Sequence, residues 1–230
     1  MDFILTGIGK ALQLLLQGDG ETYAAVLATV RASLYSMTAS LLLGIPMGYG
    51  LGYFSFPGRQ TIRVLVDTLL ALPTVFIGLL VYAFLSQRGP LGNLGLLFSL
   101  EGIAIGQTIL ALPIVIALTA SAVESLDRSL RLTLVSLGAS KRQLFFSSIK
   151  EARIGIIVAA ITASGRVLTE VGISMMVGGN IKWHTRTITT AIALETNKGQ
   201  FAMGIALGIV LLAMAFTVNF SLSFLRRRGL

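Results

Sequence analysis

The sequence lacks several of the residue types and motifs from which catalytic and metal sites are built. It contains no cysteine and a single histidine, His184, so it can form no disulfide and no metal site made of histidine and cysteine. A Gly-x-x-x-x-Gly-Lys-Ser/Thr phosphate-binding loop is also absent, which excludes ATP hydrolysis by that route. The polar segments hold no plausible set of nucleophile, base and orienting group. We therefore expect a chain that is not an enzyme.

Charged residues are scarce as well. They make up 12% of the 230 residues, while hydrophobic residues make up 54%, and the mean hydropathy is +0.84. This composition excludes an ordinary soluble domain and indicates an integral membrane protein. The net charge of +8 does not point to nucleic acid, because the basic residues lie at the ends of apolar runs, where anionic lipid headgroups can neutralise them.

Five apolar runs are long enough to cross a bilayer, which takes about 20 residues of helix. They lack the alternation of barrel strands, and they cover residues 24–53, 62–85, 102–123, 154–177 and 201–225. The expected fold class is therefore an all-α integral membrane protein with five transmembrane helices in residues 23–230. Residues 1–22 contain an apolar run too short to span, followed by a turn-like Gly-Asp-Gly, which predicts a short helix at the membrane interface.

Lysine and arginine are distributed unevenly between the two ends of these runs. If the polar segment 124–153 is cytoplasmic, eleven of the eighteen lie on that side and five on the other, with Arg31 and Arg166 inside spans. The cytoplasmic set is Arg59, Arg63, Arg128, Arg131, Lys141, Arg142, Lys150, Arg153, Arg226, Arg227 and Arg228, and the outer set is Lys10, Arg88, Lys182, Arg186 and Lys198. By the positive-inside rule, we expect the N-terminus outside and the C-terminus in the cytoplasm.

Two local patterns bear on how the spans pack and bend. Gly44, Gly48 and Gly52 recur every four residues, a spacing that lets helix backbones approach closely in lipid, although glycine is also simply common in membrane helices. The hexapeptide Thr-Leu-Leu-Ala-Leu-Pro at 68–73 nearly repeats as Thr-Ile-Leu-Ala-Leu-Pro at 108–113. It places a proline near the middle of the second and third spans, which predicts a kink in each. Such kinks either widen a lumen or are ordinary bends.

The polar segment 124–153 has a recognisable layout. A short amphipathic run is followed by Gly-Ala-Ser at 138–140 and by a second amphipathic run. This layout resembles the coupling loop of binding-protein-dependent ABC importer permeases, which typically reads Glu-Ala-Ala, three residues, Gly-Ala-Ser, and later Leu-Pro. Here residues 132–134 replace the acidic opening, and Lys150 and Glu151 replace Leu-Pro. Without that proline, the second helix is expected to run directly into the fourth span.

Later segments resemble tungstate permeases, which are close relatives of molybdate permeases. They are Lys-Glu-Ala-Arg at 150–153, Gly-Arg-Val-Leu-Thr-Glu-Val-Gly at 165–172, Met-Val-Gly-Gly-Asn-Ile at 176–181, and the threonine-rich run at 185–196. The resemblance implies a homodimer that forms an oxyanion pathway and an extracytoplasmic tungstate-binding protein that delivers the anion. It also implies two ATPase subunits, which hold the ATP and Mg²⁺. The implied ATPase-coupling residues are Arg128, Arg131, Leu137, Gly138, Ala139, Ser140, Lys141 and Phe145.

Four charged residues are candidates for the pathway. Arg166 lies about 18 Å along the fourth span, near the bilayer midplane, and Glu170 follows four residues later. Either the two form an ion pair, or Arg166 faces the pathway between two copies and shapes the field that an oxyanion meets. Lys182 and Arg186 alternate with hydroxyl and aromatic residues at the outer mouth. They would suit an oxyanion or a loaded binding protein, or they form a solvated loop.

Other functions are compatible with the same residues. A permease of this architecture could carry molybdate, methionine or another small solute. A secondary transporter would work without ATP and typically has inverted repeats around an ion site in the membrane, for which Arg166 and Glu170 are thin evidence. A structural or assembly protein of the membrane would carry no flux.

Overall fold

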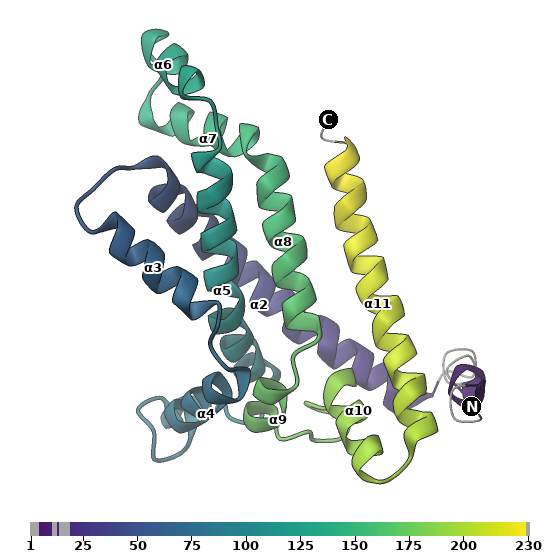
Figure 1. Ribbon diagram of the computed structural model, residues 1–230. Helices are drawn as coiled ribbons and strands as arrows, with labels where there is room; N and C mark the ends of the chain where they lie inside the picture. Colours follow the sequence, from purple (N-terminus) through teal and green to yellow (C-terminus); the bar gives the residue numbers. More distant parts are fainter. Residues whose placement is uncertain (1–4, 11–12, 14–18, 229–230) are drawn as a thin grey trace.

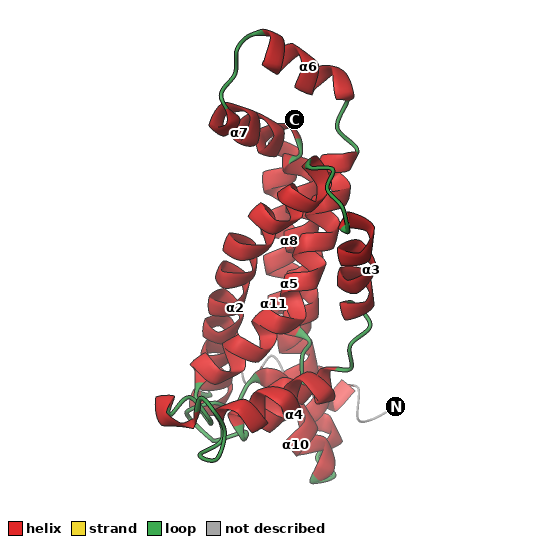
Figure 2. Ribbon diagram, turned by 90° about the vertical axis from the view of Figure 1, so that its left-hand side faces the viewer, coloured by secondary structure: helices red, strands yellow, loops and turns green. Residues whose placement is uncertain are grey.

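The chain folds into an elongated bundle of helices (Figure 1). The structure is a computed structural model that describes residues 5–10, 13 and 19–228. Three helices there are long and apolar enough to cross a membrane alone, namely α2 (Gly20–Tyr53), α5 (Leu100–Glu124) and α11 (Phe201–Arg228). Two further pairs are long and apolar enough when each is counted as one bent span, α3 (Arg59–Leu69) with α4 (Thr74–Leu85), and α8 (Arg153–Leu168) with α9 (Gly172–Gly178). The described residues contain no strand, which confirms the all-α prediction (Figure 2).

The second and fourth spans are broken helices, bent by 98° and 58°. The sequence predicted only a kink in the second span and no break in the fourth span. Both predictions underestimated the bend. Pro73 stands in an extended conformation immediately before α4, because proline has no N–H and disfavours a helical residue before it. In the fourth span, residues 169–171 leave the helix before Gly172 begins α9. Pro113, by contrast, lies inside α5, which continues through it.

Helices α2 and α5 pack closely along a row of glycines. A β-carbon placed on Gly48 would lie 2.8 Å from the carbonyl oxygen of Ile116, and one on Gly52 would lie 2.6 Å from the carbonyl oxygen of Ala120. Gly44 is similarly tight against α5, so the whole glycine triple faces this helix. The packing role predicted from its four-residue spacing is confirmed, because no larger residue leaves room for the two backbones.

The two ends of the bundle carry different elements. Helices α6 (Arg128–Ser136) and α7 (Lys141–Glu151) project from the end at which α11 finishes, while α4, α9 and α10 (Ile188–Asn197) lie at the other end (Figures 1 and 2). The short 3₁₀ turn η1 (Gly92–Leu94) follows α4. The 25 residues of α5 make about 37 Å of helix. The polar segment 124–153 is therefore separated from the opposite surface by roughly the thickness of a bilayer.

Only part of the predicted interfacial segment is described. Residues 5–10 are helical, and a β-carbon on Gly7 would lie 2.5 Å from Cγ2 of Ile205, so this turn rests on α11. The rest of the segment up to residue 18, residue 13 excepted, lies outside the described residues. Helix α2 begins at Gly20, where Asp19 accepts a hydrogen bond from the N–H of Thr22 at 2.8 Å. The predicted boundary after residue 22 thus falls inside the first turn of α2.

Candidate functional site

The Gly-Ala-Ser turn joins α6 to α7 with a fixed geometry. Gly138 has φ +78°, a left-handed conformation that glycine adopts without a steric cost. The N–H of Ala139 donates to the carbonyl of Leu134 at 3.0 Å and closes the end of α6. The Oγ of Ser140 accepts from the N–H of Gln143 at 3.3 Å, and the Gln143 side chain accepts from the N–H of Ser140 at 2.7 Å. This capping box begins α7, so the backbone itself requires the glycine and favours the serine.

The polar segment 124–153, called the coupling segment below for its resemblance to such loops, exposes several apolar side chains. They are Leu132, Val135, Leu137 and Phe146. Leu137, in the turn itself, is 78% exposed, and Lys141 beside it is exposed too. An apolar cluster on a polar, projecting segment is typical of a protein-interaction surface. Arg128 and Arg131 lie on α6, but their side chains are outside the described part of the structure.

Asp127 caps the N-terminus of α6. Its Oδ1 accepts a hydrogen bond from the backbone N–H of Ser129 at 2.8 Å. That bond, together with the Ser129 hydroxyl, holds the pKa of the Asp127 carboxyl below its ordinary value. Because the folded-state pKa is lowered, the stabilisation is complete above the ordinary aspartate pKa and is lost as the pH falls through the folded value. The cap is therefore fully ionised at neutral pH.

Phe145 has an internal contact. Its ring lies 4.7 Å from that of Tyr49 in an edge-to-face arrangement, and it packs on a small core that contains Val123 and Ala152. The sequence placed Phe145 among the ATPase contacts, whereas the structure turns it toward the bundle, where it anchors α7. Only Ala152 separates α7 from α8. The prediction that the second helix of the loop runs directly into the fourth span is confirmed.

The exposed residues of α8 and its C-cap are all polar. Thr162, Arg166 and Thr169 are exposed, and their spacing of four and three residues places them on one face of the helix. Gly165, between them, has nothing within 4 Å of the place a β-carbon would take. By contrast, α11 exposes large apolar side chains, namely Phe201, Leu212, Phe216, Phe220 and Phe224. A polar stripe within a span meets water or another chain rather than lipid.

Arg166 and Glu170 do not form the ion pair that their spacing suggested. Helix α8 ends at Leu168, so Glu170 lies beyond it, and among the described residues no ion pair joins the two. Glu170 is buried, and its Oε1 accepts the N–H of Ile173 at 2.9 Å. Its carbonyl accepts the hydroxyl of Thr189 at 2.8 Å. Glu170 therefore ties the broken span to α9 and α10, while Arg166 points away from the chain's core.

Lys182 and Arg186, at the end of the bundle opposite α6 and α7, share one counter-ion. The Nζ of Lys182 lies 2.6 Å from Oε2 of Glu21 in the first turn of α2, and Arg186 binds Oε1 of the same carboxylate. Arg186 also donates from Nε to the side chain of Asn180 at 3.1 Å. The three charged residues border a pocket of about 400 Å³. One carboxylate balances only one of the two positive charges, so this group of three side chains keeps a net positive charge.

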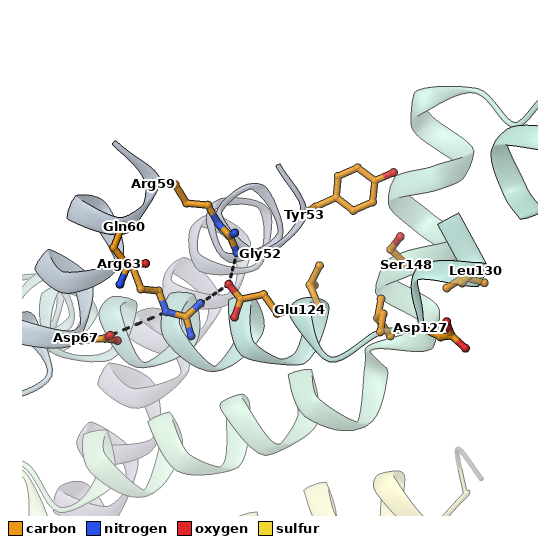
Figure 3. A pocket seen from close by; sticks show the side chains of 12 residues that line it. Gly52, Tyr53, Arg59, Gln60, Arg63, Asp67, Glu124, Asp127, Leu130 and Ser148 are labelled. Atoms are coloured by element: carbon orange, nitrogen blue, oxygen red, sulfur yellow. Dashed lines mark hydrogen bonds and ion pairs between the residues drawn. The ribbon is translucent and has the colours of Figure 1, made fainter. Parts of the chain in front are cut away.

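A larger pocket, of about 700 Å³, lies between α3, the end of α5 and the coupling segment (Figure 3). Arg59 and Arg63 both reach Oε1 of Glu124 there, and Nη1 of Arg63 stands 2.7 Å from it. Nε of Arg63 also lies 4.0 Å from Oδ2 of Asp67, one helical turn further along α3. Sequence reasoning missed Glu124, because 61 and 65 residues separate it from its partners and no local pattern connects them.

Comparison with protein families decides the class of the molecule. Residues 41–228 match the family of binding-protein-dependent transport system inner membrane components. The chain belongs to this family. It is thus a multi-pass permease component of an inner membrane, and the match includes the segment 124–153.

Named relatives share most of the permease. It is 46% identical to the tungstate uptake system permease protein of Campylobacter jejuni, over 99% of this chain and 95% of that one. It is 34% identical to the tungstate uptake system permease protein of Peptoclostridium acidaminophilum, over 95% and 96%. A probable anion ABC transporter permease protein of Haloferax volcanii is 40% identical, over 87% and 90%.

Solved structures share the fold of the permease. An inward-facing MetNI methionine ABC transporter has a chain that matches with a TM-score of 0.75 at 19% identity, over 91% of this chain and 96% of that chain. A bacterial alginate ABC transporter, in complex with its alginate-bound periplasmic protein, matches with a TM-score of 0.73, also at 19% identity, over 94% and 81%. These structures share the overall fold of this chain.

Proposed function

We propose that this permease is the membrane subunit of an ATP-driven importer of tungstate. Two relatives of the chain are tungstate uptake permeases and a third is a probable anion permease. The observation that carries the proposal is the polar stripe on α8, where Arg166 stands exposed between two threonines. A guanidinium flanked by hydroxyl groups is suited to the oxygens of an oxyanion.

A second copy of the chain completes this stripe. An arginine that faced lipid at the middle of a span would cost about 2.5–3.5 kcal/mol on insertion scales. Pairing two copies through their α8 faces removes that cost, because each Arg166 then lines a wet pathway. Two guanidinium groups across a two-fold axis match the double negative charge of tungstate. Neither guanidinium group is paired with a carboxylate of its own chain in this arrangement. A passing anion therefore displaces only water from the two groups, and it is released again.

Energy comes from another chain in this proposal. Two ATPase subunits, which bind the ATP and Mg²⁺, dock on the exposed leucines and valine of α6 and the following turn. Their closure moves α6 and α7 as levers, and the α7–α8 connection passes that movement into the span that carries Arg166. The pathway thereby alternates between inward and outward access. The permease chain needs no cofactor for these steps.

The outer end receives the anion in this proposal. With the coupling segment in the cytoplasm, Glu21, Lys182 and Arg186 lie outside, as does the N-terminus, and the C-terminus lies inside. A tungstate-binding protein docks on this surface of paired charges, where opposite charges on the partner would steer and orient it. Because Lys182 and Arg186 share the single carboxylate of Glu21, this surface keeps a net positive charge that an acidic face of the partner would complement.

Tungsten accumulation tests this function. Cells that lack the gene should take up little tungstate at nanomolar concentration, and the wild-type gene should restore uptake as measured by elemental analysis. A tenfold excess of molybdate or sulfate should compete weakly. Strong competition by molybdate would reassign the substrate within the oxyanions, and unchanged tungsten content without the gene would reject the function.

A further inference from the structure

We propose that Glu124, through its two arginine partners, is a positioning residue that carries the movement of the coupling segment into α3. The inference rests on the proposed function, because it requires a partner ATPase to move that segment. Glu124 is the last residue of α5, and α6 begins at Arg128. A force applied to α6 therefore reaches Glu124 across a connection of only a few residues.

The bonds at Glu124 join three elements. Its Oε1 accepts both Arg59 and Arg63, which lie on the first two turns of α3. Arg63 also donates from Nη2 to Oγ of Ser121 at 2.8 Å, so it holds α5 by two bonds. Arg59 donates from Nε to the carbonyl of Leu51 at 2.8 Å, in the last turn of α2. The ends of α2 and α5 and the start of α3 thus share one network (Figure 3).

Helix α3 has little else to hold it to the bundle. Val66 is its single buried residue, and it packs on Leu51 and Ile116. Most of the other side chains of α3 are exposed. A helix with one buried residue is held to its neighbours mainly by hydrogen bonds and ion pairs. The bonds of Glu124 with Arg59 and Arg63 therefore determine how closely α3 moves with the end of α5.

Movement of α3 would be passed through α4 to α9. Beyond the 98° bend, α3 continues as α4, which packs against α9. A β-carbon on Gly78 of α4 would lie 3.2 Å from Met176 of α9, and one on Gly172 of α9 would lie 3.2 Å from Val75 of α4. Helix α9 is the continuation of α8, which carries Arg166. The cluster therefore connects the cytoplasmic segment to the outer half of the proposed pathway by a route separate from α7 and α8.

The charges around the cluster provide a matched control. Asp67 is the other carboxylate beside Arg63, at 4.0 Å, but it lies on α3 itself and ties no second helix. Glu124→Gln and Asp67→Asn each remove one negative charge from the same pocket with little change in size. Only the first of them weakens the connection between α5 and α3, because it removes the carboxylate charge that both arginines share, while the bond from Arg63 to Ser121 remains.

The experiment compares both variants in the assembled transporter with its ATPase and binding protein. Glu124→Gln should lower the tungstate moved per ATP hydrolysed by about fivefold, with ATPase activity retained, and Asp67→Asn should leave this ratio unchanged. A merely structural role of Glu124 would reduce the yield and both rates together and leave the ratio intact. That result, or an equal effect of the two variants, would overturn the inference.

Amide hydrogen exchange in the isolated permease gives a second readout that needs no ATPase. Exchange along residues 59–69 should be faster in Glu124→Gln than in wild type, by at least about fivefold, and unchanged in Asp67→Asn. Unaltered exchange in Glu124→Gln would reject the tie between α5 and α3. A wild-type complex that fails to couple ATP to tungstate would instead reject the proposed function, and with it the role of Glu124 in coupling.

Discussion

Gly48 of α2 lies so close to α5 that a β-carbon on it would stand 2.8 Å from the carbonyl oxygen of Ile116. Gly48→Ala should therefore push α2 and α5 apart and destabilise the permease by about 1–3 kcal/mol. Gly50 is the control, because it lies on the same helix with nothing within 4 Å of its β-carbon position. Gly50→Ala should be neutral or stabilising, since alanine favours helix over glycine by about 1 kcal/mol. Thermal unfolding in detergent measures both, and an equal loss in the two variants would contradict this packing.

Gly138 sets the coupling turn through its positive φ of 78°. Gly138→Val should cost about 1–2 kcal/mol of local strain and disturb the start of α7, so less ATPase should co-purify with the permease. Gly138→Asn is the matched variant, because asparagine adopts this conformation more readily. Undiminished ATPase recovery with Gly138→Val would contradict the placement of the turn at the ATPase interface.

Arg166 and Glu170 should act independently, since they are not paired. Arg166→Gln should leave the amount of folded protein unchanged and lower tungstate uptake by at least about tenfold, equivalent to about 1.4 kcal/mol in the barrier. Glu170→Ala removes the acceptor for the N–H of Ile173 and should destabilise the protein by about 1–3 kcal/mol. In the double variant, Arg166→Gln with Glu170→Ala, the stability should equal that of Glu170→Ala alone. Recovery of stability or uptake in the double variant would show that an ion pair does form in the membrane.

The cysteine-free sequence makes topology directly measurable. Asn197→Cys, at the end of α10, should react with an impermeant thiol reagent in intact cells. Thr133→Cys, on α6, should react only after the membrane is opened. The reverse pattern would invert the orientation of every loop.

Hydropathy and local turn chemistry predicted much of this fold, and long-range contacts account for what they missed. The near-identical hexapeptides that end in Pro73 and Pro113 show the limit of prediction from local sequence, because they adopt different structures. The first hexapeptide lies at the break between α3 and α4, where the chain bends by 98°. The second lies inside α5, which stays helical through it. Pro113 is buried within the bundle, where neighbouring helices hold α5 in place, while Pro73 is exposed. Tertiary packing decides the difference.

The candidate sites divide in the same way. The Gly-Ala-Ser turn was predictable because the left-handed glycine and the Ser140–Gln143 capping box are local devices. The ion pair of Arg166 with Glu170 was predicted wrongly, because the rule for residues four apart holds only while the helix continues. Glu21 as the counter-ion of Lys182 and Arg186 has no signature in the sequence. Both it and Glu124 come into place only when distant helix ends meet.

Transport by the purified complex in sealed vesicles tests the central claim most directly. The permease, its ATPase and a tungstate-loaded binding protein are reconstituted with either the wild-type permease or the Arg166→Gln variant. The amount of tungsten inside the vesicles is then measured per ATP hydrolysed. The account predicts accumulation that requires ATP and the binding protein, and that falls at least about tenfold in Arg166→Gln. Accumulation that proceeds without ATP on an ion gradient, or that is unaffected by the loss of Arg166, would contradict it.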